Sequence, residues 1–132
     1  MSGSRMVTYL DSTYQETLSL IKEARDYIAS GTRARHAWLA PEARLQICCE
    51  SMRLTARLTQ VMAWLMMQRA VQSGEVPVEE AAKPENRLSG QVVCGHVQST
   101  PEGTDQKMQD LLGRSHALYV RIARLDSQLD RT

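Results

Sequence analysis

The stretch that decides the fold spans residues 41–74 and reads PEARLQICCESMRLTARLTQVMAWLMMQRAVQSG. Pro41 suits the first turn of a helix, and Glu42 beside it complements the helix macrodipole. Neither proline nor glycine occurs again until Gly74, which is typical of a residue that ends a helix in a left-handed conformation. The stretch therefore predicts one helix over residues 41–73, about 50 Å long at about 1.5 Å per residue.

Another helix is predicted over residues 12–30, ahead of the long one. Its apolar side chains recur three and four positions apart and form one stripe, namely Tyr14, Leu18, Ile21, Ala24 and Ile28. Thr13 and Glu16 have the spacing of a capping box, and Gly31 stands where a left-handed residue ends a helix. We therefore expect this helix to begin near residue 12.

The last helix is predicted over residues 105–129, where apolar positions alternate by three and four in a heptad pattern. Thr104 is its expected N-cap, and Gly113 weakens the pattern without ending it. Residues 74–103 are rich in glycine and proline and predict a long loop, with one helical turn near residues 78–82. We expect residues 82–103 to be mobile or held by few contacts.

Composition agrees with an all-α protein. The chain has 132 residues, which suits a single domain over residues 1–132. Phe is absent and only two Trp and four Tyr occur, so the core consists mainly of Leu, Met and Ala, which favour helices over a β-sandwich or barrel. The pattern predicts an all-α three-helix bundle with a long central helix.

Charge, cysteines and hydropathy narrow the class of protein. Sixteen Lys and Arg against fifteen Asp and Glu give a net charge of +1, which does not favour nucleic-acid binding through net charge alone. Three cysteines, two of them adjacent, do not form a disulfide framework, and we expect reduced thiols. Residues 1–13 lack the apolar run of a signal peptide, and the longest apolar run, residues 61–67, is too short for a membrane span. These features predict a cytoplasmic protein.

No constellation of residues predicts catalysis, a metal or a cofactor. Cys94 and His96 supply only two metal ligands, and no second pair has zinc-ligand spacing. Cys48 and Cys49 lie on an apolar-sided helix, where we expect buried structural thiols rather than a nucleophile. The glycines are scattered singly, so the sequence contains no glycine-rich phosphate loop. We therefore expect a protein that is not an enzyme.

The central helix is apolar over a wide arc. At about 100° per residue, its first apolar face consists of Leu45, Met52, Ala56, Ala63, Met66 and Ala70, and its second of Ile47, Leu54, Leu58, Val61 and Leu65. Together these faces span about 220°, whereas a surface helix needs only about 100°. Two neighbours in the bundle could cover much of this arc. We expect a homodimer to cover the rest, through Leu54, Leu58, Val61 and Leu65.

The remaining face of the central helix carries a polar stripe, which consists of Arg53, Arg57, Gln60, Trp64 and Gln68. Arg and Trp are enriched at protein-binding hot spots, and a Trp on a polar stripe needs something to cover it. Either a partner protein covers Trp64, or the last helix or the long loop covers it within the chain. The sequence leaves these two alternatives open.

Residues 51–76, SMRLTARLTQVMAWLMMQRAVQSGEV, resemble the central signature of the RcdA family of bacterial proteins, the regulators of CtrA degradation. The last helix is similar to the third helix of that family in the spacing of Ser115, Leu118, Tyr119, Arg121, Arg124, Leu125 and Asp126. The early helix is similar too, in Glu23, Ala24, Arg25 and Tyr27. The resemblance implies a cytoplasmic three-helix bundle that dimerises and has no active site.

The resemblance also implies a function. It implies an adaptor that assists the ClpXP protease through ClpX, together with a receiver-domain response regulator. Such an adaptor promotes the degradation of protein cargo such as cell-cycle regulators. The implied partner-binding positions are Arg53, Arg57, Gln60, Trp64, Gln68, Arg69, Tyr119, Arg121, Arg124 and Asp126. The alternative function is that of a helical transcription-associated regulator, which binds DNA or a DNA-binding protein through its arginines. Neither hypothesis requires a cofactor or a membrane.

Overall fold

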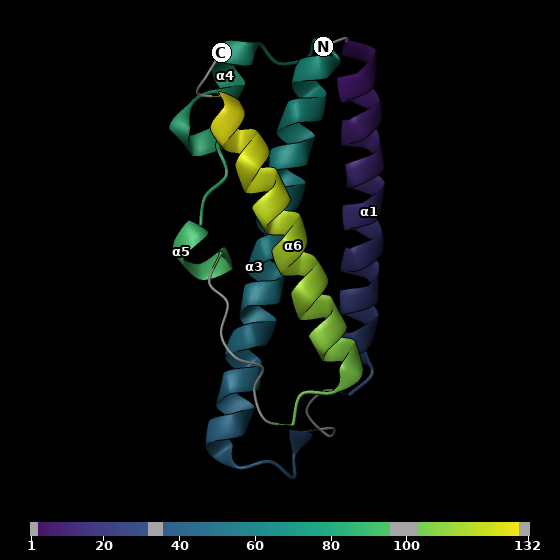
Figure 1. Cartoon of the computed structure of the whole chain (residues 1–132), viewed down its shortest axis with the longest axis vertical. Helices are drawn as coiled ribbons and strands as arrows, with labels where there is room; N and C mark the ends of the chain where they lie inside the picture. The colour runs from purple at the N-terminus through teal and green to yellow at the C-terminus, as the bar shows by residue number, and fades with distance from the viewer. Residues whose placement is uncertain (1–2, 32–35, 96–102, 130–132) are drawn as a thin grey trace.

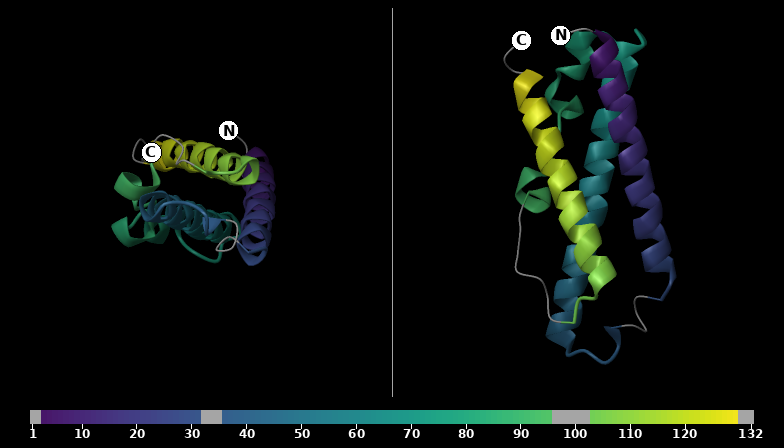
Figure 2. Two further views of the ribbon diagram at one scale, coloured as in Figure 1. Left: turned by 90° about the horizontal axis from the view of Figure 1, so that it is seen from below. Right: turned by 45° about the vertical axis from the view of Figure 1, so that its right-hand side comes forward.

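The computed structural model describes residues 3–31, 36–95 and 103–129. Three long helices form the molecule, namely α1 (Gly3–Ala29), α3 (Pro41–Gln72) and α6 (Gln106–Gln128) (Figure 1). Each of them packs against the other two, as the view from below in Figure 2 shows. The described residues contain no strand. The prediction of an all-α bundle with a long central helix is confirmed.

The first helix extends further toward the N-terminus than expected, because it begins at Gly3 rather than near residue 12. Thr13, part of the expected capping box, lies inside the helix and is buried, and its carbonyl accepts a hydrogen bond from Thr17 Oγ1 at 2.8 Å. The apolar stripe continues upstream through Leu10, which is only 2% exposed. Packing of Leu10 in the core stabilises turns that capping chemistry alone does not predict.

The ends of α3 and α6 mostly agree with the sequence. Gly74 follows α3 with a φ of 82°, which confirms it as the left-handed residue beyond the helix end. The N-cap of α6 is Asp105 rather than Thr104, because the Asp105 carboxylate accepts a hydrogen bond from the Met108 amide at 2.8 Å. Gly113 lies within α6 and does not interrupt it.

The connection between α3 and α6 is more structured than its composition predicts. It contains α4 (Val78–Ala81), η1 (Pro84–Asn86) and α5 (Gln91–Cys94), which lie along one side of the bundle in Figure 1. The helical turn expected near residues 78–82 is confirmed by α4. Leu88 is 6% exposed and Cys94 1%, so the expectation of a mobile or sparsely held segment is wrong for residues 82–95. Residues 96–102, with His96, lie outside the described residues.

The core contains the second apolar face of α3, packed against α1 and α6. Leu54, Leu58, Val61 and Leu65 all lie in this core and are at most 5% exposed. The expectation that these four residues form a dimer interface is therefore corrected, because a single chain already buries them. The first apolar face of α3 is the one that remains exposed.

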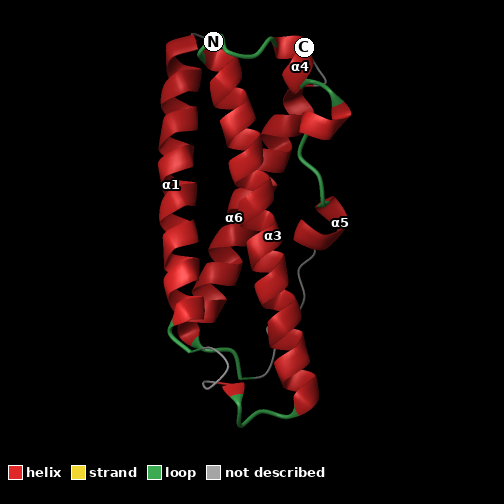
Figure 3. Ribbon diagram, turned by 180° about the vertical axis from the view of Figure 1, so that it is seen from behind, coloured by secondary structure: helices red, strands yellow, loops and turns green. Residues whose placement is uncertain are grey.

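At its N-terminal end, the long central helix projects beyond α1 and α6 (Figure 3). Its first turns therefore have no long helix beside them. Across the described ranges, no helix is both long and apolar enough to cross a membrane.

Candidate protein-binding site

The polar stripe of α3 faces α6 and the connection, and Arg57 lies at its centre. The Arg57 side chain is 3% exposed. Its Nε donates to the Cys94 carbonyl at 2.9 Å, and its Nη1 donates to Ser115 Oγ at 3.2 Å. Burial lowers the pKa of Arg57, although the carboxylate of Glu50 opposes this effect. The guanidinium thus fastens α5 and α6 to α3 through neutral acceptors.

About two turns further along α3, Trp64 is covered by the last turns of α6. Its indole nitrogen donates to Asp126 Oδ1 at 2.9 Å, and the indole is 5% exposed. The same carboxylate oxygen accepts from Arg87 Nε at 2.8 Å and from the Leu88 amide at 3.3 Å. A single buried anion therefore joins α3, α6 and the connection.

Two further side chains bind the connection at Ser89. Gln60 Oε1 accepts hydrogen bonds from the Ser89 amide at 3.2 Å and from its hydroxyl at 2.8 Å. The Tyr119 hydroxyl donates to the Ser89 carbonyl at 2.8 Å, and burial raises the pKa of Tyr119 to about 12. We call the side chains of Gln60, Trp64, Tyr119 and Asp126 the α3–α6 cradle. Gln60, Tyr119 and Asp126 bind Arg87–Ser89 directly, and Trp64 binds Asp126.

The structure thus brings five of the ten expected partner-binding residues together, namely Arg57, Gln60, Trp64, Tyr119 and Asp126, and uses them to bind the chain itself. Of the two alternatives for Trp64, the structure supports cover from within the chain. Gln68 is also buried, at 8% exposure, and Arg53 is ion-paired with Glu50 at 2.7 Å. Arg57, Trp64 and Gln68 therefore offer no open surface to a protein or to DNA.

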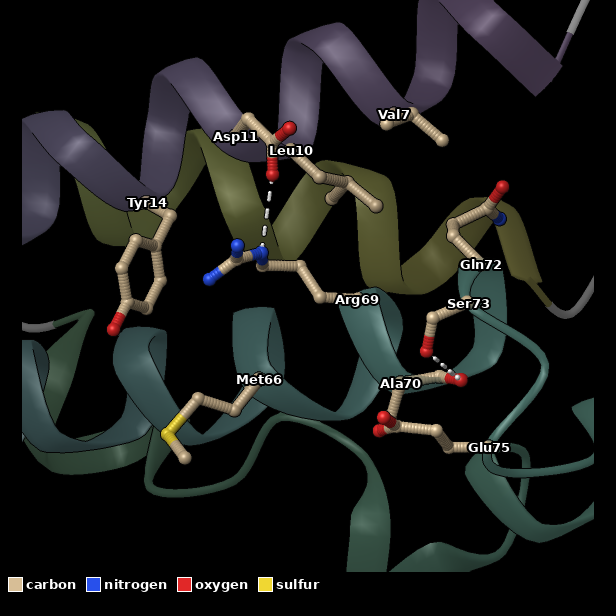
Figure 4. Close-up of a pocket in the computed structure, with 10 residues that line it drawn as sticks. All are labelled: Val7, Leu10, Asp11, Tyr14, Met66, Arg69, Ala70, Gln72, Ser73 and Glu75. Atoms are coloured by element: carbon tan, nitrogen blue, oxygen red, sulfur yellow. Dashed lines mark hydrogen bonds and ion pairs between the residues drawn. The ribbon is translucent and has the colours of Figure 1, made fainter.

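Three of the expected residues remain at the surface, in separate places. Figure 4 shows Arg69 beside a hollow between α1 and the end of α3, with its Nε 3.1 Å from Asp11 and its guanidinium 4.2 Å from the centre of the Tyr14 ring. Arg121 on α6 pairs with Glu16 at 2.7 Å. Arg124 is exposed on the same helix. Their role in partner binding stays a prediction.

A second surface lies on the first apolar face of α3. The α3 seam, as we call it, consists of Leu45, Cys48, Met52, Thr59, Ala63 and Met66, all of them exposed. Leu45 is 64% exposed, Met52 67% and Met66 58%, values that are high for large apolar side chains. Cys48 and Cys49 are exposed as well, so the expectation that they are buried thiols is corrected; no element of the described chain covers them.

Three hollows follow one another along the seam. One of about 550 Å³ is lined by Pro41, Leu45 and Cys48 near the start of α3. The next, of about 720 Å³, lies between α1 and α3 around Thr59 and Ala63. The third, of about 430 Å³, is the one in Figure 4, at the far end of α3. The lining of each hollow includes seam residues, and apolar side chains predominate in the first two.

The sequence pattern does not predict the contacts of Arg87, Leu88 and Ser89. The available signal was Leu88, the one large aliphatic residue between Val78 and Val92. In a polar segment, such a residue favours an anchored turn over a mobile loop. Within the described residues, no group of three or more His, Cys, Asp or Glu side chains could hold a metal ion.

Comparison with known proteins identifies a family and a similar solved structure. The model of a family described as a protein of unknown function (DUF1465) matches residues 4–132. The crystal structure of RcdA from Caulobacter crescentus is 36% identical in sequence, over 91% of this chain and 89% of that one, with a TM-score of 0.67. The sequence matches none of the curated proteins.

Proposed function

The chain belongs to the DUF1465 family and is RcdA-like in sequence and fold, and from this we propose that it is a non-enzymatic adaptor in regulated proteolysis. In this proposal it works in the cytoplasm and brings cell-cycle regulators to ClpXP, together with a receiver-domain response regulator. The observation that carries the proposal is the likeness to RcdA over nine-tenths of the chain.

The exposed arginines of α6 supply a contact surface for this role. Arg124 is exposed near the C-terminal end of α6, and Arg121 lies one turn away with a side chain 43% exposed. Arginine is enriched at binding hot spots because it combines charge, planarity and several donors. We propose these two residues as contacts for ClpX or for the receiver-domain protein.

A degradation assay tests the adaptor role. Purified ClpXP, the receiver-domain protein and a panel of purified cell-cycle regulators are combined with and without the chain. We expect at least one regulator to disappear severalfold faster when the chain is present, while the chain itself is not consumed. Arg124→Glu should reduce this acceleration, and Gln109→Glu, an exposed change at the other end of α6, should not. If no regulator is degraded faster, the adaptor proposal fails.

We further propose that the chain is a homodimer through the α3 seam. The seam is nearly symmetric about Thr59, since Met52 and Met66 each lie seven residues from it. Ala63 and the exposed Thr55, which adjoins the seam, each lie four residues from it. In an antiparallel pair of α3 helices crossing at Thr59, Met52 of one copy therefore lies opposite Met66 of the other. The small side chains at the centre allow the two helices to approach closely.

The ends of the seam are complementary in the same register. Leu45 lies fourteen residues before Thr59, and Ser73 lies fourteen residues after it, in the hollow at the end of α3. Leu45 of one copy therefore reaches the hollow of the other. Arg44 and Glu75, at the two ends, likewise come together with opposite charges. A two-fold interface repeats each of these contacts.

A further inference from the structure

The segment Arg87–Ser89 lies across α3 and α6 in the manner of a bound peptide. Its backbone is extended at Arg87, with φ −86° and ψ 161°. The Leu88 amide, the Ser89 amide and the Ser89 carbonyl bond to the side chains of Asp126, Gln60 and Tyr119. Among the described residues, no backbone-to-backbone hydrogen bond involves Leu88 or Ser89. The bundle therefore holds these residues through main-chain groups that any extended peptide possesses.

Two side chains of the segment add selectivity. Arg87 binds Asp126 through its Nε at 2.8 Å, and its Nη2 donates to the Asp126 carbonyl at 2.6 Å. Leu88 is 6% exposed and belongs to the same buried cluster as Trp64 and Tyr119. The cradle thus favours a segment in which a basic residue is followed by an aliphatic one.

We propose that the α3–α6 cradle is a binding site for an extended segment of a partner protein, with a basic residue next to an aliphatic one, and that Arg87–Ser89 occupies this site as an autoinhibitory contact. The segment can leave without disturbing the helices of the bundle, because the η1 turn precedes it and Gly90, with a φ of 76°, follows it. The inference names the class of segment that the proposed adaptor would hold, and to that extent it rests on the proposed function.

Because Arg87–Ser89 is part of the same chain as the cradle, it competes with any partner segment and lowers that segment's apparent affinity. A segment joined to its site by short linkers competes at an effective concentration on the order of millimolar. A peptide added in solution meets only the fraction of molecules whose cradle is open, so its apparent affinity falls in proportion. Weakening the chain's own segment should therefore strengthen the binding of the same sequence added as a separate peptide.

Leu88→Ala makes this test, because it removes the segment's aliphatic anchor and leaves all four cradle side chains in place. The probe is a fluorescent peptide with the sequence of residues 84–93, PENRLSGQVV. By fluorescence anisotropy we expect it to bind the Leu88→Ala variant about tenfold or more tightly than the unmodified chain, the scale expected when a buried Leu is truncated. A peptide in which aspartate replaces the leucine should not bind.

Leu20→Ala is the matched control, since Leu20 is also a buried leucine, at 2% exposure, but lies in α1 and not in the cradle. It destabilises the protein generally and should leave the affinity for the peptide unchanged. If folded Leu88→Ala protein binds the peptide no better than the unmodified chain, or if Leu20→Ala strengthens binding equally, the proposal fails. The assay contains no protease, so this failure is distinct from a failure of the adaptor role.

Hydrogen exchange on the unmodified chain decides the case if Leu88→Ala protein does not fold. We expect the amides of Leu88 and Ser89 to exchange at least tenfold faster than those of Leu118 and Ile122 in the buried part of α6, because the segment opens locally. Equal exchange rates would show that the segment leaves only on global unfolding, and would overturn the proposal.

Discussion

The indole nitrogen of Trp64 lies 2.9 Å from a carboxylate oxygen of Asp126, which ties the central helix to the last turns of α6. The same oxygen binds Arg87 of the connection. The hydrogen bonds that converge on this buried carboxylate replace those that water would make. Trp64 and Asp126 therefore hold α3, α6 and the connection together. This contact explains why a Trp lies on a helix face that is otherwise polar.

Trp64→Ala should lower the free energy of unfolding by about 3–5 kcal/mol, because it opens a cavity and removes a donor from a buried anion. Trp64→Phe keeps most of the volume and loses the hydrogen bond, so its cost should be clearly smaller. Urea denaturation followed by circular dichroism measures both. Arg124→Ala is the control, since an exposed residue of the same helix should change stability by less than about 0.5 kcal/mol. A Trp64→Ala protein as stable as this control would contradict the burial of the indole.

Glu23 should make stability depend on pH below the neutral range. Hydrogen bonds from Arg114 and Lys107 lower the pKa of Glu23 from 4.5 to about 2. A carboxyl whose pKa is lower in the folded state stabilises the protein above its unfolded pKa. This contribution is lost as the pH falls from about 4.5 to about 2. Because the side chain is 31% exposed, we expect about 1 kcal/mol or less.

The measurement compares Glu23→Gln with the unmodified chain by urea denaturation at pH 6, 4, 3 and 2. The difference in unfolding free energy should be largest at pH 6 and should approach zero at the lowest pH. Glu79→Gln is the control, because Glu79 is exposed and forms no ion pair in the described part of the chain. A Glu23 difference that stays constant with pH would show that the ion pairs do not lower the pKa.

The sequence predicts the long helices well because their signals are local. Pro41 and Gly74 mark the ends of α3, and helical spacing shows which residues share a face. The start of α1 was missed because the burial of Leu10 depends on other helices. Helical spacing identified both apolar faces of α3, but the face expected to form a dimer is buried within the chain. Which face α1 and α6 cover is a tertiary property.

The candidate site was predictable in its residues but not in its occupant. Arg57, Trp64 and Asp126 were expected to bind something, and each does bind, at distances of 2.8–3.4 Å. What they bind lies within the chain: Trp64 binds Asp126, Arg57 binds α5 and α6, and Asp126 binds Arg87 in a connection whose composition suggests a free loop. Hydrogen bonds from side chains to the backbone do not require a regular spacing of residue types. The sequence pattern therefore does not identify Leu88 and Ser89 as contacts.

Two glycines should respond in opposite directions to the same substitution. Gly74 has a φ of 82°, a conformation that costs an L-residue about 1 kcal/mol, so Gly74→Ala should destabilise the protein by about that amount. Gly113 is inside α6, and an added Cβ there meets no atom within 4 Å. Gly113→Ala should therefore stabilise the protein by about 0.5–1 kcal/mol. Thermal melting gives both signs, and a rise in melting temperature for Gly74→Ala would contradict the cap.

The α3 seam should control association, and single charges on it should separate the dimer. Met52→Lys and Met66→Glu each place a charge on an apolar interface, yet both residues are exposed in one chain, at 67% and 58%, so the monomer should stay folded. Sedimentation should show monomers for each variant and dimers for the unmodified chain. Ala117→Glu, an exposed change on α6, should leave the dimer intact.

Mixing the two charged variants tests the register of the dimer. In the antiparallel arrangement, Lys substituted at residue 52 of one copy faces Glu substituted at residue 66 of the other, so the equimolar mixture of Met52→Lys and Met66→Glu should form a heterodimer. Each variant alone instead sets its charge against a methionine. In a parallel arrangement residue 52 would meet residue 52, so each variant alone would set like charges against each other, and mixing would leave each charge opposite a methionine without an ion pair. Recovery of dimer only in the mixture therefore supports antiparallel packing about Thr59, and monomers in the mixture would rule it out.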